Sequence, residues 1–598
     1  MLVPSCTFQA IPVAPGIAIG RVMRSADVAQ TVPAAEIIAT ERVDAELARF
    51  HASLDQTREQ LTDLKKQMQG RFEGNESEIF DAQLLLVDDP MMVADVEKNI
   101  SGNLYCAEYA VHVTLEKYFE TFAHLNDDYL KERALDLRDV GLRILGNISN
   151  TPQNSIDYNE PRIIIASNLT PTQTVALNRD MTLGFAVETG SATSHTAILA
   201  RSLKLPAVVG VPRELLEKLT VEDKLIIDGF TGKVLVNPSA LDEESYRLKR
   251  HEALKFYHEL VEDNGLPPDT IDGFRVELAA NLDSEQNYDQ VKQAKGAGIG
   301  LFRTEFIFMA PEELPDENTQ FEIYKQLLVA AGDQPVTIRT LDVGGDKLNS
   351  RISRAVEQNP FLGLRGIRLC LHERRDIFTT QLRALLRAGV HGNLRIMLPM
   401  VSSTIELADT KELIRTIQQQ LTEEGIPFST QFKLGIMIET PVAALIAEQF
   451  APNVDFFSIG TNDLIQYTMA VDRSNERVAY LYRPSHPAIL KLIKHTVQAA
   501  KANNIYVSVC GQIAETIMMT PLLIGLGVNE LSMPVSAIPL QRRTIRSLSR
   551  YECENLVEKA LCCKNAAEVM TLVETMLADK APALKAFEGN IGIDSKTE

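Results

Sequence analysis

The sequence lacks several features, and each absence excludes a class of protein. No apolar run approaches the roughly 18–20 residues that a helix needs to cross a bilayer. The N-terminus has neither the basic segment nor the long apolar stretch of a signal peptide. The seven cysteines are scattered and form no C-x-x-C pair, which is typical of reduced thiols in a cytoplasm. We therefore expect a soluble, cytoplasmic protein without a membrane partner.

Positive charge is also scarce. Lys and Arg together number 60 against 80 Asp and Glu, which gives a formal net charge of −20. A protein that binds nucleic acid needs a basic face against the phosphate backbone, so we do not expect nucleic acid as the main partner. A local cluster of arginines around a small anion remains compatible with this charge. The 598 residues are enough for about three to five domains.

The hydrophobic period changes early in the chain. Residues 10–24 have the pattern of short strands punctuated by Gly and Pro. From Val43 to Met68, apolar residues recur every three or four positions, which is the period of a long helix. Asp89 followed by Pro90 has the form of a helix N-cap with proline at the first helical position. We interpret residues 28–150 as an inserted subdomain of antiparallel helices.

The segments that flank this subdomain predict one α/β domain. Residues 151–237 alternate short strands and helices, and residues 1–27 are strand-like too. The simplest arrangement is a single compact domain with the helices inserted into it. Residues 238–268 contain one long helical pattern and predict a linker helix. A C-terminal tail is expected over residues 576–598.

Strand and helix patterns alternate eight times over residues 269–575. This repetition predicts a (β/α)₈ TIM barrel, with an open doubly wound sheet as the alternative. The predicted fold class is therefore multidomain α/β, with an α/β domain, an inserted helical bundle, a linker helix and a C-terminal barrel. The strands are expected at Phe274–Ala280, Ile299–Phe302, Val336–Leu341, Leu394–Leu398, Lys433–Ile438, Val454–Ile459, Ile505–Val509 and Glu530–Met533.

Polar residues follow these strands at the end where TIM barrels carry their active sites. Arg303 follows the second strand, Arg339 lies in the third, Glu439 follows the fifth, Asp463 follows the sixth and Cys510 follows the seventh. Arginine binds phosphate bidentately, and one or two carboxylates suit Mg²⁺. A single arginine could form an ordinary surface salt bridge. Repetition over successive strands instead predicts a site for a small phosphorylated carboxylic acid with Mg²⁺.

His195 lies where a Gly- and Ser-containing turn, residues 190–194, enters a helical pattern. Helix N-termini present free N–H groups and the positive end of the helix dipole, and both stabilise a phosphoryl group. Histidine can also act as a nucleophile that forms a covalent intermediate. From these residues alone, a capped helix start with an ordinary hydrogen-bonded histidine remains the alternative.

Two long motifs resemble those of a known family. Residues 190–203 (GSATSHTAILARSL) are similar to the phosphohistidine motif of phosphoenolpyruvate-utilising enzymes, and residues 455–473 (DFFSIGTNDLIQYTMAVDR) resemble their barrel signature. Residues 80–90 and 127–133 look like the helical insert of the Enzyme I family of the bacterial sugar phosphotransferase system. Members of that family are phosphoenolpyruvate–protein phosphotransferases. The resemblance covers nearly the whole chain in the same domain order.

The resemblance implies a reaction and its partners. Phosphoenolpyruvate would phosphorylate Nε2 of His195, with Thr174 as a hydrogen-bonding neighbour. The phosphoryl group would then pass to a histidine of the phosphocarrier HPr, docked on the helical insert, and pyruvate would be released. Glu439 and Asp463 would bind Mg²⁺, Cys510 would protonate enolpyruvate, and the barrel would form a homodimer. Phosphoenolpyruvate would be held by Arg303, Arg339, Lys347, Arg365, Arg473 and the backbone of Asn462.

Three positions depart from the family's usual pattern. Ala192 stands where a basic residue commonly precedes Thr-Ser-His, Gln512 replaces a Glu after Cys-Gly, and Gln83 replaces a histidine of the partner-facing helix. Ala192 and Gln512 leave open a regulatory or attenuated phosphocarrier of the same fold. A pyruvate phosphate dikinase or phosphoenolpyruvate synthase would need a large ATP-binding domain before the histidine domain, and we see no room for one.

Overall fold

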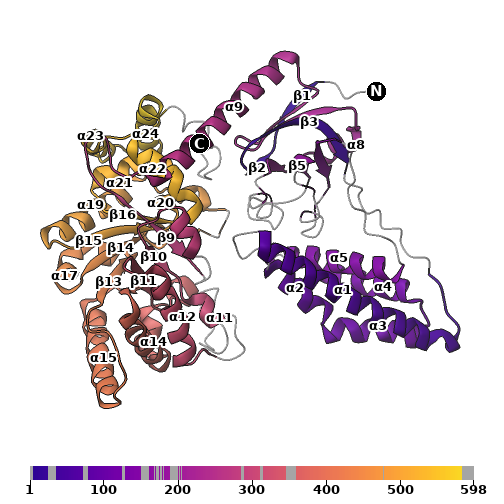
Figure 1. The fold of residues 1–598 in the computed structure, drawn as a ribbon, viewed down its shortest axis with the longest axis horizontal. Coiled ribbons are helices and arrows are strands. Elements are labelled where there is room, and N and C mark those ends of the chain that lie inside the picture. Colours follow the sequence, from indigo (N-terminus) through magenta and orange to yellow (C-terminus); the bar gives the residue numbers. More distant parts are fainter. Residues whose placement is uncertain are drawn as a thin grey trace. The chain divides into compact units, whose positions relative to one another are not determined.

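The chain divides into two compact units, one formed by residues 1–255 with 586–598 and the other by residues 256–585 (Figure 1). Each unit is described by itself. The computed structural model describes residues 5–24, 35–71, 78–123, 128–149, 160–167, 169, 174, 178, 181–188, 200, 203, 205–283, 288–309, 314–344, 359–473, 475 and 477–581. No described helix combines the length and apolar character that a membrane span requires.

Five helices follow the first strands of the N-terminal unit, as the apolar periodicity predicts. The N-cap predicted at Asp89 is confirmed, because its Oδ1 accepts the backbone N–H groups of Met91 and Met92 at 2.8 and 3.3 Å. Phe50 and Leu61 of the predicted seam are buried in the core of this helical group. The helices are α1 (Val43–Arg71), α2 (Glu78–Val87), α3 (Pro90–Asn103), α4 (Ala107–Ala123) and α5 (Asp128–Ile148).

An eight-stranded sheet joins the segments before and after these helices. Its strand order is β1-β8-β7-β3-β4-β5-β6-β2, with β3 antiparallel to β7 and parallel to β4. The helices therefore enter the chain between two neighbouring strands of one sheet. The strands are β1 (Cys6–Gln9), β2 (Ile11–Ala14), β3 (Ile17–Arg24), β4 (Arg162–Ala166), β5 (Thr182–Val187), β6 (Ala207–Val209), β7 (Lys224–Asp228) and β8 (Lys233–Val236), with α8 (Arg213–Lys218) after β6.

The predicted linker helix is confirmed as α9 (Ala240–Glu262), and the division between the two units falls within it. Its 23 residues span about 35 Å at ~1.5 Å per residue. Near its start, Glu243 pairs with Lys224 of β7 at 2.6 Å. Near its end, Glu259 pairs with Arg543 at 3.1 Å. Each end of α9 is therefore held by an ion pair within a different unit.

The C-terminal unit contains a closed barrel of eight parallel strands, so the TIM barrel is confirmed and the open sheet was the wrong alternative. The first strand begins at Glu277 rather than Phe274, because Thr270 Oγ1 accepts the Phe274 N–H in a turn that occupies the preceding residues. The strands are β9 (Glu277–Leu282), β10 (Ile299–Phe302), β11 (Pro335–Arg339), β12 (Asn393–Leu398), β13 (Lys433–Ile438), β14 (Phe456–Gly460), β15 (Tyr506–Cys510) and β16 (Glu530–Met533).

Helices surround the barrel strands (Figure 1). The last of them, α24, continues past residue 575, where the sequence analysis places the start of the tail. They are α10 (Tyr288–Gln293), α11 (Glu305–Met309), α12 (Glu317–Ala331), α13 (Ile367–His372), α14 (Arg375–Ala388), α15 (Thr404–Glu423), α16 (Pro441–Leu445), α17 (Ala447–Phe450), α18 (Thr461–Met469), α19 (Pro487–Ala502), α20 (Gln512–Glu515), α21 (Thr520–Leu526), α22 (Ile538–Arg546), α23 (Arg550–Ala560) and α24 (Ala566–Lys580).

Alternation along the barrel strands separates two cores. On β13, Ile436 and Ile438 belong to the large core that includes the surrounding helices, whereas Met437 belongs to a small cluster with Leu301, Met397, Phe456 and Cys510. Successive side chains of a strand point to opposite faces, so this second set fills the barrel interior. Residues that continue the inner face past the strand ends therefore project into the barrel mouth.

Candidate active site

A cavity of ≈ 180 Å³ opens at the C-terminal ends of the barrel strands. It contains every predicted barrel residue that the structure describes. Arg339 ends β11, Cys510 ends β15, and Glu439 immediately follows β13. The predicted residues that line the cavity are Arg303, Arg339, Arg365, Glu439, Asn462, Asp463, Arg473 and Cys510.

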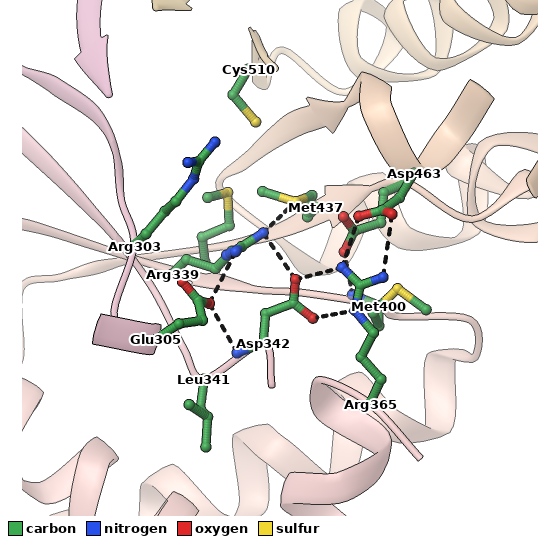
Figure 2. Close-up of polar contacts among 12 residues, drawn as sticks. Arg303, Glu305, Arg339, Leu341, Asp342, Arg365, Met400, Met437, Asp463 and Cys510 are labelled. Atoms are coloured by element: carbon green, nitrogen blue, oxygen red, sulfur yellow. Dashed lines mark hydrogen bonds and ion pairs between the residues drawn. The ribbon is translucent and has the colours of Figure 1, made fainter. Parts of the chain in front are cut away.

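The guanidinium of Arg365 lies between two carboxylates (Figure 2). Its Nη2 is 2.9 Å from Asp342 Oδ2 and 2.8 Å from Asp463 Oδ2, and its Nε donates to Asp342 Oδ1 at 3.0 Å. Only 9% of this side chain is exposed. Burial opposes the positive charge, but the two carboxylates outweigh it and raise the pKa of Arg365 above its usual range. The site is thus held by a buried, charge-compensated bridge.

Arg339 extends this network to a further acid. Its Nη2 donates to Glu305 Oε1 at 2.9 Å, and its Nη1 is 3.0 Å from Asp342 Oδ2. Glu305 also accepts the backbone N–H of Asp342 at 3.1 Å. Among the residues that the structure describes, the Nε of Arg339 has no hydrogen-bond partner although it is buried. One N–H of this guanidinium is therefore left unpaired by the described residues.

Three carboxylates meet within this cavity. Asp342, Glu439 and Asp463 each offer an oxygen, and these oxygens all lie within 4.8 Å of one another. Glu439 is fully buried, and burial together with the nearby Asp342 and Asp463 raises the pKa of its carboxyl to about 8. The negative charges of the three carboxylates repel one another. A hard divalent cation, which prefers oxygen ligands, would relieve this repulsion. The donor set therefore fits a divalent metal ion.

The backbone orients Glu439, one of these three carboxylates. Met400 N–H donates to Glu439 Oε1 at 2.6 Å, and Met400 adopts a φ of 58°. A non-glycine residue in the left-handed region is strained, and such strain is concentrated at functional sites. This hydrogen bond fixes one oxygen of Glu439 within the carboxylate cluster.

Asp342 and Glu305 were not among the residues predicted for the site. Asp342 lies three residues after the end of β11, and Glu305 lies three residues after the end of β10. The role of Asp342 depends on Arg365, which approaches from the turn before α13. No local sequence pattern reports that contact.

Arg303, Arg473 and Asn462 offer further anion-binding groups. Arg303 lies to one side of the network, 3.7 Å from Asp283 and 38% exposed (Figure 2). Arg473 is exposed beyond α18. Asn462 is the second residue of α18, and N–H groups in the first turn have no partner within a helix. These groups can contact a ligand without breaking the buried bridge.

Cys510 provides a buried thiol in the same cavity as these arginines. Its side chain is 2% exposed, and Ser458 Oγ donates to its Sγ at 3.4 Å. Burial raises the pKa of the thiol, so the sulfur keeps its proton at neutral pH. Gly511 follows with a φ of 104°, and a Cβ there would lie 2.6 Å from Thr461 Oγ1. Only glycine fits this close approach, which holds Cys510 at the cavity wall.

The other predicted residues are not part of this cavity. Thr174 belongs to the N-terminal unit, where its side chain is buried. His195, Ala192 and Lys347 lie outside the described residues. Gln83 lies on α2, the helix expected to face the partner, but its side chain is fully buried and its Nε2 donates to Asp139 Oδ2 at 3.0 Å. That substitution therefore changes the bundle interior rather than an exposed surface.

Comparisons with known proteins agree with the fold and the site. Three family models match: "PEP-utilising enzyme, N-terminal" over residues 9–133, "PEP-utilising enzyme, mobile domain" over residues 158–232, and "PEP-utilising enzyme, PEP-binding domain" over residues 258–550. The last range contains the complete barrel and its cavity. The fold and the site therefore define a phosphoenolpyruvate-utilising enzyme.

Curated relatives narrow this class. A phosphoenolpyruvate-protein phosphotransferase of Staphylococcus carnosus (strain TM300) is 42% identical over 533 residues, covering 89% of this chain and 92% of that protein. Its counterpart from Geobacillus stearothermophilus is 41% identical over 574 residues, covering 95% and 98%. A solution structure of Enzyme I is 38% identical and covers 41% of this chain and 98% of its own, with a TM-score of 0.35. The chain belongs to the phosphoenolpyruvate-protein phosphotransferase family.

The raised pKa of Glu439 predicts how cation binding depends on pH. A proton competes with the cation for a carboxyl whose pKa is about 8. The apparent affinity should therefore fall below that pH, by up to about tenfold per pH unit. Mn²⁺ binding followed by electron paramagnetic resonance at about pH 6.5 and about pH 8.5 measures this. Glu439→Gln should bind more weakly and lose the pH dependence. Equal affinity of the unmodified protein for Mn²⁺ at both pH values would contradict a role of Glu439 in cation binding.

Proposed function

We propose that this protein transfers the phosphoryl group of phosphoenolpyruvate to its own His195 and then to a histidine of an HPr-type phosphocarrier, and that it releases pyruvate. The observation that carries the proposal is the barrel cavity, where four arginines, a carboxylate cluster and a buried thiol meet. The names of the relatives, 41–42% identical over most of the chain, support the same reaction.

The charges of the cavity favour this substrate. Four arginines and the four carboxylates of Glu305, Asp342, Glu439 and Asp463 line it, so its described charges nearly cancel. A phosphorylated carboxylic acid carries about three negative charges, which would be unfavourable alone in such a cavity. A divalent cation that enters with it removes most of that excess. Substrate and cation are therefore expected to bind together.

We assign Mg²⁺ to Glu439 and Asp463, with Asp342 as a third candidate ligand. When bound, the ion would neutralise charge on the phosphoryl oxygens. The protein's own part is to position that group. Arg365 and Arg339 are fixed by their carboxylate partners, so they face the phosphoryl group without further ordering. Arg303 and Arg473, at the rim, can bind the substrate from the opposite side, and Lys347 is proposed to join them.

Phosphoryl transfer needs positioning and charge neutralisation more than covalent assistance. Neutral His195 would attack phosphorus through Nε2 while the arginines stabilise the equatorial oxygens. The leaving group is enolpyruvate, and the protonated thiol of Cys510 would deliver a proton to its C3. Thr174 is proposed as a hydrogen-bonding neighbour of His195. Ketonisation to pyruvate makes the transfer to histidine favourable.

The same histidine must meet a small molecule and a protein, which gives each part of the chain a role. We assign the histidine to an α/β domain of residues 1–27 and 151–237, and carrier docking to residues 28–150. Residues 238–268 would be the hinge, and residues 269–575 the barrel that also forms the homodimer. Two apolar side chains of the helical bundle support the docking role, because Leu85 is 70% exposed and Met91 is 72% exposed. We place the enzyme in the cytoplasm.

His195→Ala should abolish phosphoenzyme formation, because it removes the proposed nucleophile, and should leave the fold intact. Incubation with labelled phosphoenolpyruvate and Mg²⁺, followed by acid treatment, measures the acid-labile label. His251→Ala, which alters an exposed histidine of α9, is the matched control and should behave like the unmodified protein. Acid-labile label on His195→Ala would disprove the assignment of the nucleophile.

Glu439→Gln and Asp463→Asn should each lower the rate of autophosphorylation by at least about 10²-fold, since each removes an anionic oxygen from the proposed Mg²⁺ site. A chelator should silence the unmodified enzyme. Asp409→Asn alters an exposed acid of α15 and should leave the rate unchanged. Full activity of the unmodified protein in excess EDTA would rule out the metal role.

A fragment of residues 1–263 should accept phosphate from phosphorylated HPr but not from phosphoenolpyruvate. It retains His195 and the helical bundle, and it lacks every arginine of the barrel cavity. Label transfer in the two directions, measured on one preparation, separates the two activities. Phosphorylation of this fragment by phosphoenolpyruvate at the rate of the full chain would contradict the division of labour.

A further inference from the structure

A serine inside the barrel contacts the thiol of Cys510. Ser458 lies on β14, and its side chain is fully buried. Its Oγ donates to Cys510 Sγ on the neighbouring strand β15 at 3.4 Å. The register pairs Gly460 with Cys510 and Ser458 with Ser508. Ser458 therefore lies one inner-face position deeper in the barrel than the thiol, away from the mouth.

The surroundings of this contact are otherwise apolar. Cys510 shares its interior cluster with Leu301, Met397, Met437 and Phe456. Within the described part of the chain, Ser458 is the only side chain that hydrogen-bonds to the sulfur; the other polar contact is from Sγ to the backbone carbonyl of Ile459 at 3.7 Å. Among the described side chains, the Ser458 hydroxyl would consequently be the one hydrogen-bond donor to a negative charge on this sulfur.

We propose that Ser458 is a positioning residue that stabilises the thiolate left when Cys510 gives its proton to enolpyruvate. This inference rests on the proposed function. In that step the S–H bond breaks, and its electron pair stays on sulfur. The proton joins C3 of enolpyruvate through the C2–C3 π pair, and an oxygen pair forms the C2=O bond of pyruvate. The Ser458 hydroxyl donates to Sγ before and after the step.

The charged groups around the thiol do not make the hydrogen bond from Ser458 redundant. Burial disfavours the thiolate most strongly, and the hydrogen bond from Ser458 is the largest effect that opposes the resulting rise in the thiol pKa. Arg339 and Arg303 also favour the thiolate, whereas Glu439 disfavours it. The two arginines also face the phosphorylated substrate, so their positive charge would stabilise the substrate as well as the thiolate. Ser458 serves the sulfur alone.

The hydrogen bond also sets the direction of the proton. Because Ser458 donates to Sγ, the thiol hydrogen does not point at that hydroxyl. It is directed to the Ile459 carbonyl or to the cavity, where enolpyruvate would lie. Without the hydroxyl, the thiol would lose both this orientation and the stabilisation of its anion.

The reverse reaction tests the proposal on the full-length enzyme, because phosphoenzyme and pyruvate regenerate phosphoenolpyruvate only if a base removes a methyl proton. Ser458→Ala should slow this reaction about 10- to 100-fold, the loss expected for one hydrogen bond to a charged group. The kinetic isotope effect with methyl-deuterated pyruvate should rise, since C–H cleavage becomes limiting. The affinity for phosphoenolpyruvate should be unchanged, and Ser458→Thr, which keeps the hydroxyl, should restore the rate.

Ser508→Ala is the matched control. Ser508 is buried at the same level of the neighbouring strand, but its Oγ donates to the Phe457 carbonyl at 3.5 Å. Ser508→Ala should catalyse the reverse reaction at the rate of the unmodified enzyme. Equal losses in both serine variants, with weaker phosphoenolpyruvate binding, would reduce Ser458 to a packing residue and overturn the proposal.

Cys510→Ala distinguishes the two levels of inference. If this variant is inactive in the reverse reaction and Ser458→Ala is as fast as the unmodified enzyme, the role of Ser458 is refuted and the proposed function stands. If Cys510→Ala retains the normal rate and isotope effect, the thiol is not the acid, and the proposed role of Cys510 fails together with that of Ser458.

Discussion

The barrel site depends on the buried contact of Arg365 with Asp342 and Asp463. Removing one partner of such a group leaves an uncompensated charge away from water, which is strongly destabilising. The same contact links both proposed ligands, because the guanidinium suits a phosphoryl group and the carboxylates suit a cation. If the two ligands enter together, the phosphoryl group replaces the carboxylates as the partner of Arg365. The cation in turn replaces Arg365 as the partner of the carboxylates. The ion pair thus gives a physical reason why a phosphorylated acid and its metal ion would bind together.

The regular alternation of the strands turns this local chemistry into a site. Inner-face positions are apolar deep in the barrel, as at Met437 and Phe456, and become charged at the strand ends, as at Arg339 and Glu439. Cys510 lies where the two environments meet. A thiol there is dry enough to remain protonated and close enough to the mouth to reach a bound substrate. The Ser458 hydroxyl lies one step deeper, where it donates to the sulfur of Cys510.

Elements with a strong periodic pattern could be predicted from the sequence. The strands Ile299–Phe302, Lys433–Ile438 and Glu530–Met533 have the predicted bounds, because each is a compact apolar segment with a clear limit. The first strand was placed early, since a turn closed by Thr270 and Phe274 continues the apolar pattern. Asp342 and Gln83 show the other limit. Their roles depend on partners 23 and 56 residues away in the sequence. The hydrophobic period of one helix or strand does not show which neighbouring element each of its faces packs against.

The linker helix connects the fold with the two-partner chemistry. The proposed function requires the domain that contains His195 to present the same histidine first to the barrel and then to a carrier. Ion pairs hold Glu243 to Lys224 and Glu259 to Arg543, each within its own unit. A change between the two states therefore cannot be taken up at these ends without breaking an ion pair. Bending within the turns between Glu243 and Glu259 keeps both contacts, and the division between the units falls in that segment. We propose that the middle of the helix, between these two ion pairs, is the segment that bends.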